Sequence, residues 1–243
     1  TKLTASDGTS QDQFGHSIAI SADGTTVIVG SPGDDDNGNN SGSVYIYTLA
    51  NGAWIETQKL TASDGASEDL FGYLNVALSG DGSTAIVSAR RDDDNGNESG
   101  SVYIYSLLNG AWSETAKLIA SDGHEGDYFG EGVSLSSDGL TAIVGAPFND
   151  DQGSDSGSAY IFRFDGTDWN EEVKLTASDG LGNEYFGLTV SVSGDGTSAV
   201  IGSRGHNQFS GSAYIYKFVD GNLWEETKLL ASDGAAEDSF GYR

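Results

Sequence analysis

The sequence predicts an all-β fold: a β-propeller of four-stranded antiparallel blades, with four complete blades in this chain. Three observations predict it. A unit that begins "KLTASDG" and ends "FG" recurs along the chain, and its phenylalanines are Phe14, Phe71, Phe129, Phe186 and Phe240. Each unit holds four short apolar runs separated by turn residues, and no helical period is present. The spacings of 57, 58, 57 and 54 residues, obtained by subtracting successive phenylalanine numbers, suit a propeller blade better than a solenoid coil.

The first two runs of the first unit predict the inner half of a blade. Residues 16–21, "HSIAIS", alternate two isoleucines with small residues, as suits an inner strand crowded by its neighbours. The Asp23-Gly24 pair that follows predicts a two-residue hairpin. Residues 25–30, "TTVIVG", are apolar on both faces, so they predict a central strand that is covered on both sides.

The last two runs predict the outer half of the blade. Residues 43–49, "SVYIYTL", come after a long acidic loop and predict the third strand. An Asn51-Gly52 turn leads to residues 53–60, "AWIETQKL", which are more polar and therefore predict an outer edge strand. Tight turns alternate with long connections, so all the long connections should leave the blade at the same end of its strands.

The net charge limits the classes of partner. The chain has 37 acidic and 11 basic residues and a formal charge of -26, so nucleic acid and anionic membrane surfaces would repel it. No window approaches the roughly 18 apolar residues of a membrane span, which predicts no membrane insertion. Cysteine is absent, which excludes a disulfide framework and thiolate chemistry. We expect an extracellular or cell-surface protein whose export signal is not present in this chain.

Two longer stretches resemble a known family. "FGHSIAISADGTTVIVGSPGDDD" and "FGEGVSLSSDGLTAIVGAPFNDD" are similar to the FG-GAP repeat, and Gly145-Ala146-Pro147 reproduces the end of its core. The resemblance covers the whole chain. It implies the propeller of integrin α-subunit heads, usually of about seven blades. It also points to the bacterial branch whose exported and surface proteins carry "KLTASDG" and "DDDNG" segments.

The sequence departs from this family at one position. Integrin-type repeats often carry a calcium loop of the Asp-x-Asp-x-Asp-Gly kind between their first two strands. Here that position is "SADG", "SGDG", "SSDG" or "SGDG". A single aspartate before glycine supplies what a tight hairpin needs and too few oxygens for a calcium cage. The integrin calcium site is therefore not expected between these strands.

We expect residues 1–243 to form a single propeller domain or a fragment of one. The blades are predicted at residues 16–60, 73–118, 131–175 and 188–229, and residues 230–243 begin a further repeat. In a closed ring of four blades the first and last segments would compete for one structural position. The simpler hypothesis is a larger ring, whose missing blades come from the same longer chain or from self-association with another copy.

Three of the four units carry an acidic loop between their second and third strands. This loop should leave the blade at the same end as the linker between units, which holds Asp7 and Asp12 in the first unit. Clustered carboxylates, amides and free carbonyls are the oxygen ligands that calcium takes. The candidate calcium ligands are Asp34, Asp35, Asp36, Asn37, Asn39, Asp92, Asp93, Asp94, Asn95, Asn97, Asp150, Asp151 and Asp155.

The alternative interpretation is a solvated acidic loop whose Asp, Asn and Gly residues only satisfy turn conformations. The fourth unit separates these hypotheses. Its loop, "SRGHNQFSGS", is shorter and has no carboxylate, so it should bind no cation if the other loops do. The third loop, with fewer aspartates than the first two, should be intermediate.

The other recurring aromatic residues are predicted to be structural. Each FG phenylalanine should wedge between adjacent blades, with its glycine allowing close backbone approach. The tryptophans Trp54, Trp112, Trp169 and Trp224 should cover the blade edge, although an exposed aromatic ring can also stack on a sugar. The "ASDG" segments are expected to form turns in the linkers rather than to bind a ligand.

A non-enzymatic binding or adhesion scaffold is the predicted function. The three histidines fall at unrelated repeat positions, and no nucleophile elbow or phosphate-binding loop is present, so we expect no enzyme. A protein or glycan ligand should bind the acidic long-loop face, with calcium as an assisting cofactor. The alternative is a structural repeat unit of an extracellular filament or envelope layer.

Overall fold

The computed structural model describes residues 1–219 and 223–242. It contains four antiparallel sheets of four strands each, which confirms the predicted all-β blades. Residues 220–222 of the fourth predicted blade and residue 243 of the further repeat lie outside the described part of the chain. In chain order the strands are β1 (Ile18–Ile20), β2 (Thr26–Ser31), β3 (Ser43–Ala50), β4 (Ala53–Leu60), β5 (Val76–Leu78), β6 (Thr84–Ala89), β7 (Ser101–Leu108), β8 (Ala111–Leu118), β9 (Gly132–Leu135), β10 (Thr141–Ala146), β11 (Ser158–Phe164), β12 (Trp169–Leu175), β13 (Phe186–Val192), β14 (Ser198–Ser203), β15 (Ser212–Val219) and β16 (Leu223–Leu229).

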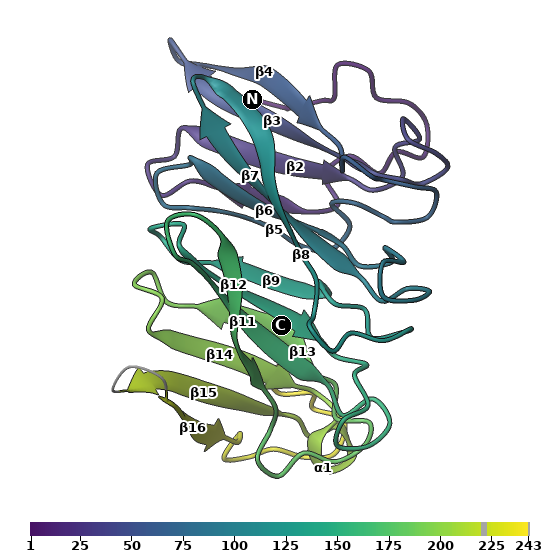
Figure 1. The fold of residues 1–243 in the computed structure, drawn as a ribbon, viewed down its shortest axis with the longest axis vertical. Coiled ribbons are helices and arrows are strands. Elements are labelled where there is room, and N and C mark those ends of the chain that lie inside the picture. The colour runs from purple at the N-terminus through teal and green to yellow at the C-terminus, as the bar shows by residue number, and fades with distance from the viewer. Residues whose placement is uncertain (220–222, 243) are drawn as a thin grey trace.

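Each sheet is a meander in which consecutive strands pair, so that β1, β5, β9 and β13 form one set of edges and β4, β8, β12 and β16 the other. The first set lies innermost, because β1 contacts β5, β5 contacts β9 and β9 contacts β13. Figure 1 shows the four sheets stacked in order, with hairpin turns at one end of the strands and long loops at the other.

Two faces follow from this arrangement. The long-loop face consists of the loops 32–42, 90–100, 147–157 and 204–211 and the linkers 1–17, 61–75, 119–131 and 176–185. The short-turn face consists of the hairpin turns at the opposite end of the strands. The four-residue turn α1 (His206–Phe209) lies in the last of the long loops. Within the described residues, no helix is long and apolar enough to cross a membrane.

The turn between the third and fourth strands has the predicted geometry. Asn51 and Gly52 have φ values of 52° and 80°, and the matching Asn109 and Gly110 have 53° and 84°. Two consecutive residues with positive φ define the type I′ hairpin, whose twist suits the flanking strands. Asn-Gly pairs are favoured there because both residues tolerate this conformation.

The Asp23-Gly24 prediction of a two-residue hairpin is wrong, because residues 21–25 separate β1 from β2. Only Gly24 of the pair has a positive φ. The Asp23 carboxylate instead accepts hydrogen bonds from the Ser21 hydroxyl at 2.6 Å and the Thr25 backbone N–H at 2.9 Å. Aspartate is favoured at this position because its carboxylate accepts hydrogen bonds from residues on both sides of the wider turn.

Hydrophobic side chains between neighbouring blades form the core. Ile28, Val44 and Ile46 of the first blade are fully buried against the second. There they join Val87 and Tyr103, which are also fully buried. The same pairing of faces recurs between the second and third blades and between the third and fourth. The central strands are therefore covered on both sides, as their sequences predicted.

The FG phenylalanines between the blades act as the predicted wedges. Phe71, Phe129 and Phe186 are at most 1% exposed. Each stands edge-on to two aromatic rings of its own blade, and Phe129 lies 5.4 Å from the Tyr160 ring and 5.9 Å from the Phe162 ring between centroids. Edge-to-face packing of this kind adds to the free energy gained from burial alone.

The glycines of the two recurring motifs meet at the blade interfaces. A Cβ atom at Gly145, the glycine of the Gly-Ala-Pro end, would lie 1.8 Å from the carbonyl oxygen of Gly187, the FG glycine of the next unit. A Cβ atom at Gly30 would lie 2.1 Å from the carbonyl oxygen of Gly72. No side chain fits at such distances, so the close packing between blades requires glycine at these positions.

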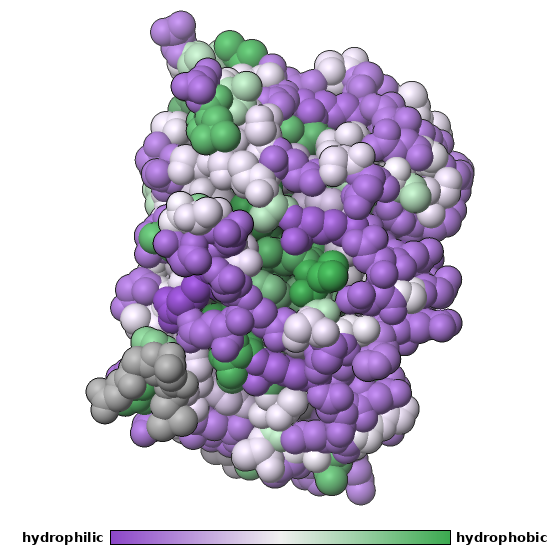
Figure 2. Space-filling view, in the orientation of Figure 1, coloured by the Kyte–Doolittle hydropathy of each residue, from purple (hydrophilic) through white to green (hydrophobic). Residues whose placement is uncertain are grey.

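The tryptophans at the start of the outer strands differ in burial. Trp112 is 6% exposed, as expected for a residue that covers a blade edge, whereas Trp54, Trp169 and Trp224 are half-buried. Figure 2 shows one side of the molecule in the orientation of Figure 1. Hydrophilic residues cover most of this side, and hydrophobic residues gather near its middle.

Candidate functional site

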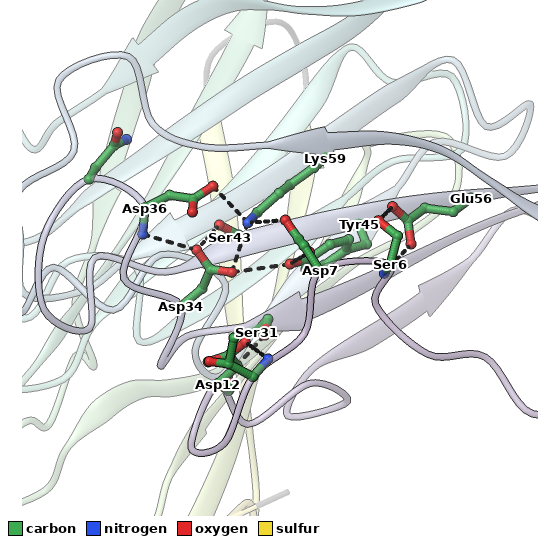
Figure 3. A network of polar contacts seen from close by, with 12 residues as sticks. Ser6, Asp7, Asp12, Ser31, Asp34, Asp36, Ser43, Tyr45, Glu56 and Lys59 are labelled. Carbon is green, nitrogen blue, oxygen red and sulfur yellow. Dashed lines mark hydrogen bonds and ion pairs between the residues drawn. The ribbon is translucent and has the colours of Figure 1, made fainter.

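Each blade presents one lysine to the long-loop face. In the first blade, Lys59 lies near the end of β4, and its Nζ atom is 2.9 Å from Asp7, 2.9 Å from Asp34 and 2.7 Å from Asp36. Figure 3 shows the three carboxylates around the ammonium group. Asp34 and Asp36 come from the loop after β2, and Asp7 comes from the linker before β1. The loop and the linker therefore meet, as the strand connectivity predicted, and the lysine joins them.

Buried hydroxyl groups hold these carboxylates in place. Asp34 is 4% exposed and accepts hydrogen bonds from the Ser43 hydroxyl at 2.9 Å and the Asp36 backbone N–H at 3.2 Å. The Tyr45 hydroxyl lies 2.7 Å from Asp7 and 3.1 Å from Asp34. The ammonium group lies over the Tyr45 ring, 5.3 Å from its centroid. The most buried charges of this network, Asp34 and Lys59, thus each have several partners, as a buried charge requires.

These contacts shift the pKa values of the network. The hydrogen bond from Lys59, with one from Tyr45, holds the pKa of Asp7 below its ordinary value. Burial alone would raise the pKa of Asp34, but hydrogen bonds from Lys59 and Ser43 outweigh it and lower that pKa. Burial alone would lower the pKa of Lys59, but its three aspartate partners raise it. Asp7, Asp34 and Lys59 are therefore charged at neutral pH.

The second blade repeats the network closely. Lys117 Nζ lies 2.7 Å from Asp64, 3.1 Å from Asp92 and 2.7 Å from Asp94. The Tyr103 hydroxyl is 2.8 Å from Asp64 and 2.9 Å from Asp92. The two blades hold the same constellation because their acidic loops have the same length, and because their loops and linkers carry the same aspartates.

The network weakens towards the end of the chain. In the third blade Lys174 keeps two aspartate partners, but the amide oxygen of Asn149, 3.3 Å away, replaces the buried third carboxylate. In the fourth blade Lys228 pairs with Asp179 at 2.6 Å, and the imidazole of His206 takes the place of the buried aspartate with its Nε2 atom 3.0 Å from Nζ. The number of carboxylates around the lysine therefore falls from three to one.

Some of the predicted calcium ligands come together in these networks. They are Asp34, Asp36, Asp92, Asp94 and Asp151, and each pairs with the lysine of its blade. The linker aspartates Asp7, Asp64, Asp122 and Asp179 join them, although the sequence had assigned these residues to turns. The loops and linkers thus form a shared polar layer on the long-loop face.

Most of the remaining predicted ligands stabilise the loops and linkers around them. Asp35, Asp93 and Asp150 each accept a hydrogen bond from the backbone N–H five residues further on. Asn37 and Asn95 each donate to a carbonyl of the adjoining linker, and Asn39 donates to Glu68. Asn97 is exposed, and Asp155 has a positive φ of 53°. The six side chains that make these hydrogen bonds act as turn and tether residues in the structure.

The aspartates of the second blade form a candidate cation site. One oxygen from each of Asp64, Asp92 and Asp94 lies within 4.8 Å of the others. Oxygen ligands suit calcium, which takes about six to eight of them. However, Lys117 Nζ stands 2.7 to 3.1 Å from these three aspartates, where an ion would have to bind. The donor set fits calcium only if the lysine side chain moves away.

Sequence reasoning gave no role to the lysines of "KLTASDG", although a signal was present. The chain has only 11 basic residues, and one lysine stands at the same position of every unit. Lys59 precedes Asp64 and Lys117 precedes Asp122 by the same five positions. A lysine that recurs in so acidic a chain is expected to act as a counter-ion for carboxylates. Which aspartates pair with it cannot be predicted locally, because they come from the preceding repeat unit.

A second feature of the long-loop face is a hollow beside the inner strands. The cavity has a volume of about 730 Å³, and its lining includes His16, Tyr73, Arg90, Glu131 and Tyr242. The Arg90 guanidinium stacks 4.5 Å from the Tyr73 ring centroid and pairs with Glu131 at 2.8 Å. The His16 ring also stacks on the Tyr73 ring, with 4.3 Å between ring centroids. The hollow therefore presents fixed aromatic and charged groups.

The lining of this hollow differs from unit to unit. The residues that follow the FG glycine are His16, Tyr73, Glu131, Leu188 and Tyr242 in successive units. Arg90 stands where the first and third units have proline. Residues that build the blades recur in every unit, whereas around the hollow arginine recurs only at Arg204 and tyrosine only at Tyr242. Packing requirements common to all blades therefore do not account for the side chains of the hollow.

Asp69, in the linker before the second blade, should make stability depend on pH. Burial, with repulsion from Asp92 and Asp93, raises its pKa to about 6 from the usual 3.8. The folded state thus binds this proton more tightly than the unfolded state, and stability from this group is lost as pH rises from about 4 to 6. Asp69→Asn should raise the free energy of unfolding at pH 7 by about 1 to 3 kcal/mol.

Urea denaturation at pH 7 and pH 4 checks this expectation. The gain of Asp69→Asn should shrink at pH 4, where the wild-type group is protonated in the folded state. Asp127→Asn is the matched control, because Asp127 accepts a hydrogen bond from the Asn149 amide at 3.1 Å, whereas Asp69 faces the Asp92 carboxylate instead. Asp127→Asn should weaken this charge-assisted bond and lose stability. A gain that is equal at both pH values would contradict the assignment.

Comparison with known proteins places the chain in a family. The FG-GAP repeat family matches it at residues 1–47, 54–105, 112–162 and 169–216. Mouse integrin alpha-2 is 29% identical over 182 residues, which cover 68% of this chain and 15% of that protein. Human integrin alpha-11 is 27% identical over 186 residues, which cover 72% of this chain and 15% of that protein. The chain thus spans a small part of these relatives.

Solved structures share the fold at low sequence identity. The hydrazine synthase of Kuenenia stuttgartiensis aligns with a TM-score of 0.55 and 15% identity, over 94% of this chain and 53% of that one. The periplasmic gluconolactonase of Pseudomonas aeruginosa aligns with a TM-score of 0.58 and 14% identity, over 91% of this chain and 59% of that one. The four repeat matches together cover most of the chain and show that it belongs to the FG-GAP repeat family.

Proposed function

We propose that this chain is a non-enzymatic binding scaffold of the cell surface or extracellular space, which holds a protein or glycan ligand on its long-loop face. The observation that carries the proposal is the hollow of about 730 Å³, whose lining differs between units on an otherwise repeated framework. Concave sites with a few fixed polar groups are the usual binding sites of proteins. The integrin alpha relatives support a role in adhesion.

The chemistry of the hollow favours binding over turnover. Arg90 and Glu131 neutralise each other at 2.8 Å, and Glu131 is 7% exposed. An acid or base that is locked in an ion pair is poorly placed to exchange protons with a substrate. Stacked rings and a fixed guanidinium instead suit recognition of a shape and of a hydrogen-bonding pattern. We therefore expect saturable binding without turnover.

The proposal includes calcium as an assisting cation at the acidic loops. The oxygen triad of Asp64, Asp92 and Asp94 supports it, and the Lys117 ammonium opposes it by standing among the same oxygens. Calcium must displace this lysine before it can bind. Binding to the native chain should therefore be weak, and it should strengthen when the lysine is removed.

A ligand screen tests the proposed function. The purified chain is immobilised and exposed to a panel of extracellular-matrix proteins and to a glycan array, with calcium and with a chelator. We expect at least one saturable interaction. His16→Ala and Tyr242→Ala, which change exposed residues of the hollow, should weaken it about tenfold.

Lys217→Ala is the control for that screen, because Lys217 is an exposed residue of β15 outside the hollow. It should leave the affinity unchanged. Absence of saturable binding across both panels would overturn the proposal. Equal loss of affinity in the control and in the two hollow variants would also count against it.

A structural repeat unit is the second candidate, and one observation favours it. Ile18 and Ile20 of β1 are 72% and 59% exposed, whereas the matching Val133 and Leu135 of β9 are 7% and 8% exposed because they pack against the preceding blade. A further blade, from a longer chain or from another copy, would cover this face. A structural unit should assemble as its concentration rises, whereas a monodisperse chain with saturable ligand binding favours the scaffold.

A further inference from the structure

The gap between the first and second blades is closed near the short-turn face by one glutamine. The Gln58 amide of β4 donates to the Trp112 carbonyl oxygen at 2.7 Å and accepts from the Trp112 backbone N–H at 2.8 Å. This pair of hydrogen bonds joins two outer strands that belong to different sheets. Trp112 is only 6% exposed beside it. The first interface is therefore filled.

The gap between the third and fourth blades is closed by a different set of side chains. The Arg163 guanidinium lies 4.9 Å from the Phe218 ring centroid and donates to the Gly196 carbonyl oxygen at 3.0 Å. Arg163 also pairs with Glu172, which accepts a hydrogen bond from the Trp224 indole N–H at 3.0 Å. Long side chains from one blade thus reach the next, and this interface is filled as well.

The interface between the second and third blades has no such closure. At the matching positions Ser106 replaces Arg163, Thr115 replaces Glu172 and Ala116 replaces Gln58. These side chains are too short to cross to the next blade. A cavity of about 400 Å³ lies there instead, and its lining includes all three of the short residues. The cavity is therefore a property of this interface rather than of the repeat.

The walls of this cavity have two different characters. The third blade supplies Phe164 and Trp169, whose ring centroids are 5.8 Å apart, together with Leu140, which is 45% exposed. The second blade supplies Leu108 and hydroxyl groups, and those of Ser106 and Thr115 are hydrogen-bonded to each other at 3.1 Å. The cavity therefore offers a bound molecule aromatic rings to stack on and hydroxyl groups within hydrogen-bonding reach.

We propose that this cavity binds one neutral sugar ring of a glycan. A pyranose has an apolar face of C–H groups that stacks on aromatic rings and an edge of hydroxyls that pairs with Ser and Thr. Asp168 lies in the lining, and the chain carries a charge of -26, so an anionic sugar would be repelled. A wholly apolar ligand would leave the hydroxyl groups without new partners. The volume of about 400 Å³ is within the range of ligand pockets.

This sugar site is separate from the ligand site of the proposed function. Its lining residues come from the hairpin turns and the adjoining strand ends of the second and third blades, at the opposite end of the strands from the long loops. Failure of one proposal therefore leaves the other untouched. Variants at this cavity should not change binding at the hollow of the long-loop face, and the reverse also holds.

Nuclear magnetic resonance with simple sugars tests the site. The probes are the methyl glycosides of glucose, galactose, mannose and N-acetylglucosamine, titrated into the full chain. The Trp169 indole N–H signal is assigned from its loss in Trp169→Phe. We expect saturable shifts of this signal for at least one glycoside, with a Kd of about 1 to 10 mM, as a single ring in an open cavity would give.

Two matched variants separate binding from a merely structural cavity. Ala116→Gln places at this interface the side chain that closes the first one, and it should weaken sugar binding at least about tenfold while thermal stability is kept. Gln58→Ala opens the first interface and should leave the affinity of the Trp169 site unchanged. The proposal is overturned if no glycoside saturates by about 50 mM. It is also overturned if Ala116→Gln binds as well as the native chain, or if indole binds and the glycosides do not.

Discussion

Phe129→Ala is expected to lower the free energy of unfolding by about 3 to 5 kcal/mol, the range for losing a large aromatic side chain from a packed core. Phe129 is 1% exposed and stands edge-on to Tyr160 and Phe162. Alanine would leave a cavity between two blades, where neither sheet can move closer without breaking its own packing. Urea denaturation followed by tryptophan fluorescence measures the loss.

The repeat supplies the control for this prediction. Phe240 occupies the same motif position but is 37% exposed, so Phe240→Ala should cost less than about 1.5 kcal/mol. Phe129→Leu keeps most of the side-chain volume and should lower the free energy of unfolding by about 1 to 2 kcal/mol. This variant should therefore remain folded even if Phe129→Ala does not. Similar losses for Phe129→Ala and Phe240→Ala would contradict the role of burial between blades.

Lys117→Met is expected to lower the free energy of unfolding by about 2 to 4 kcal/mol, because it strips the counter-ion from a buried carboxylate. Asp92 is 4% exposed and lies 3.1 Å from the Lys117 ammonium. Without it, three aspartates would face one another with no opposing charge among them. Thermal and urea denaturation at pH 7 measure the loss.

Two other lysines serve as comparisons for the loss of stability expected from Lys117→Met. Lys228→Met should cost less than Lys117→Met, because Lys228 pairs with one aspartate rather than three. Lys217 is exposed on β15, and Lys217→Met should stay within about 0.5 kcal/mol of the native chain. A cost for Lys217→Met as large as that for Lys117→Met would show that the network contributes nothing specific.

Calcium should distinguish the two roles of the acidic loops. Millimolar calcium is expected to restore part of the stability of Lys117→Met, since an oxygen-bound cation can replace the missing ammonium. It should leave Lys228→Met unchanged, because that blade has one carboxylate at this place. Isothermal titration gives the affinities directly. No calcium binding by Lys117→Met would remove calcium from the proposed function.

The blades themselves could be predicted because their pattern is local. Alternation in "HSIAIS", two-sided apolar runs such as "TTVIVG" and the Asn51-Gly52 turn specify strands and hairpins within a few residues, and the structure has them. The recurring FG phenylalanines predicted wedges, and Phe71 and Phe186 are fully buried. The wider turn around Asp23 was missed because a hydrogen-bonding aspartate and a hairpin aspartate have the same local sequence.

The sequence by itself thus determined the strands, their order and the gathering of acidic loops on one face, because each follows from spacing along the chain. Tertiary structure alone decided which groups meet. Lys117 reaches Asp64 across 53 residues, and Ala116 leaves a cavity only because the second and third blades pack together there. Side chains that are distant in sequence come into contact only because the sheets pack together. The local sequence around a carboxylate therefore cannot predict whether it pairs with a lysine, an ion or water.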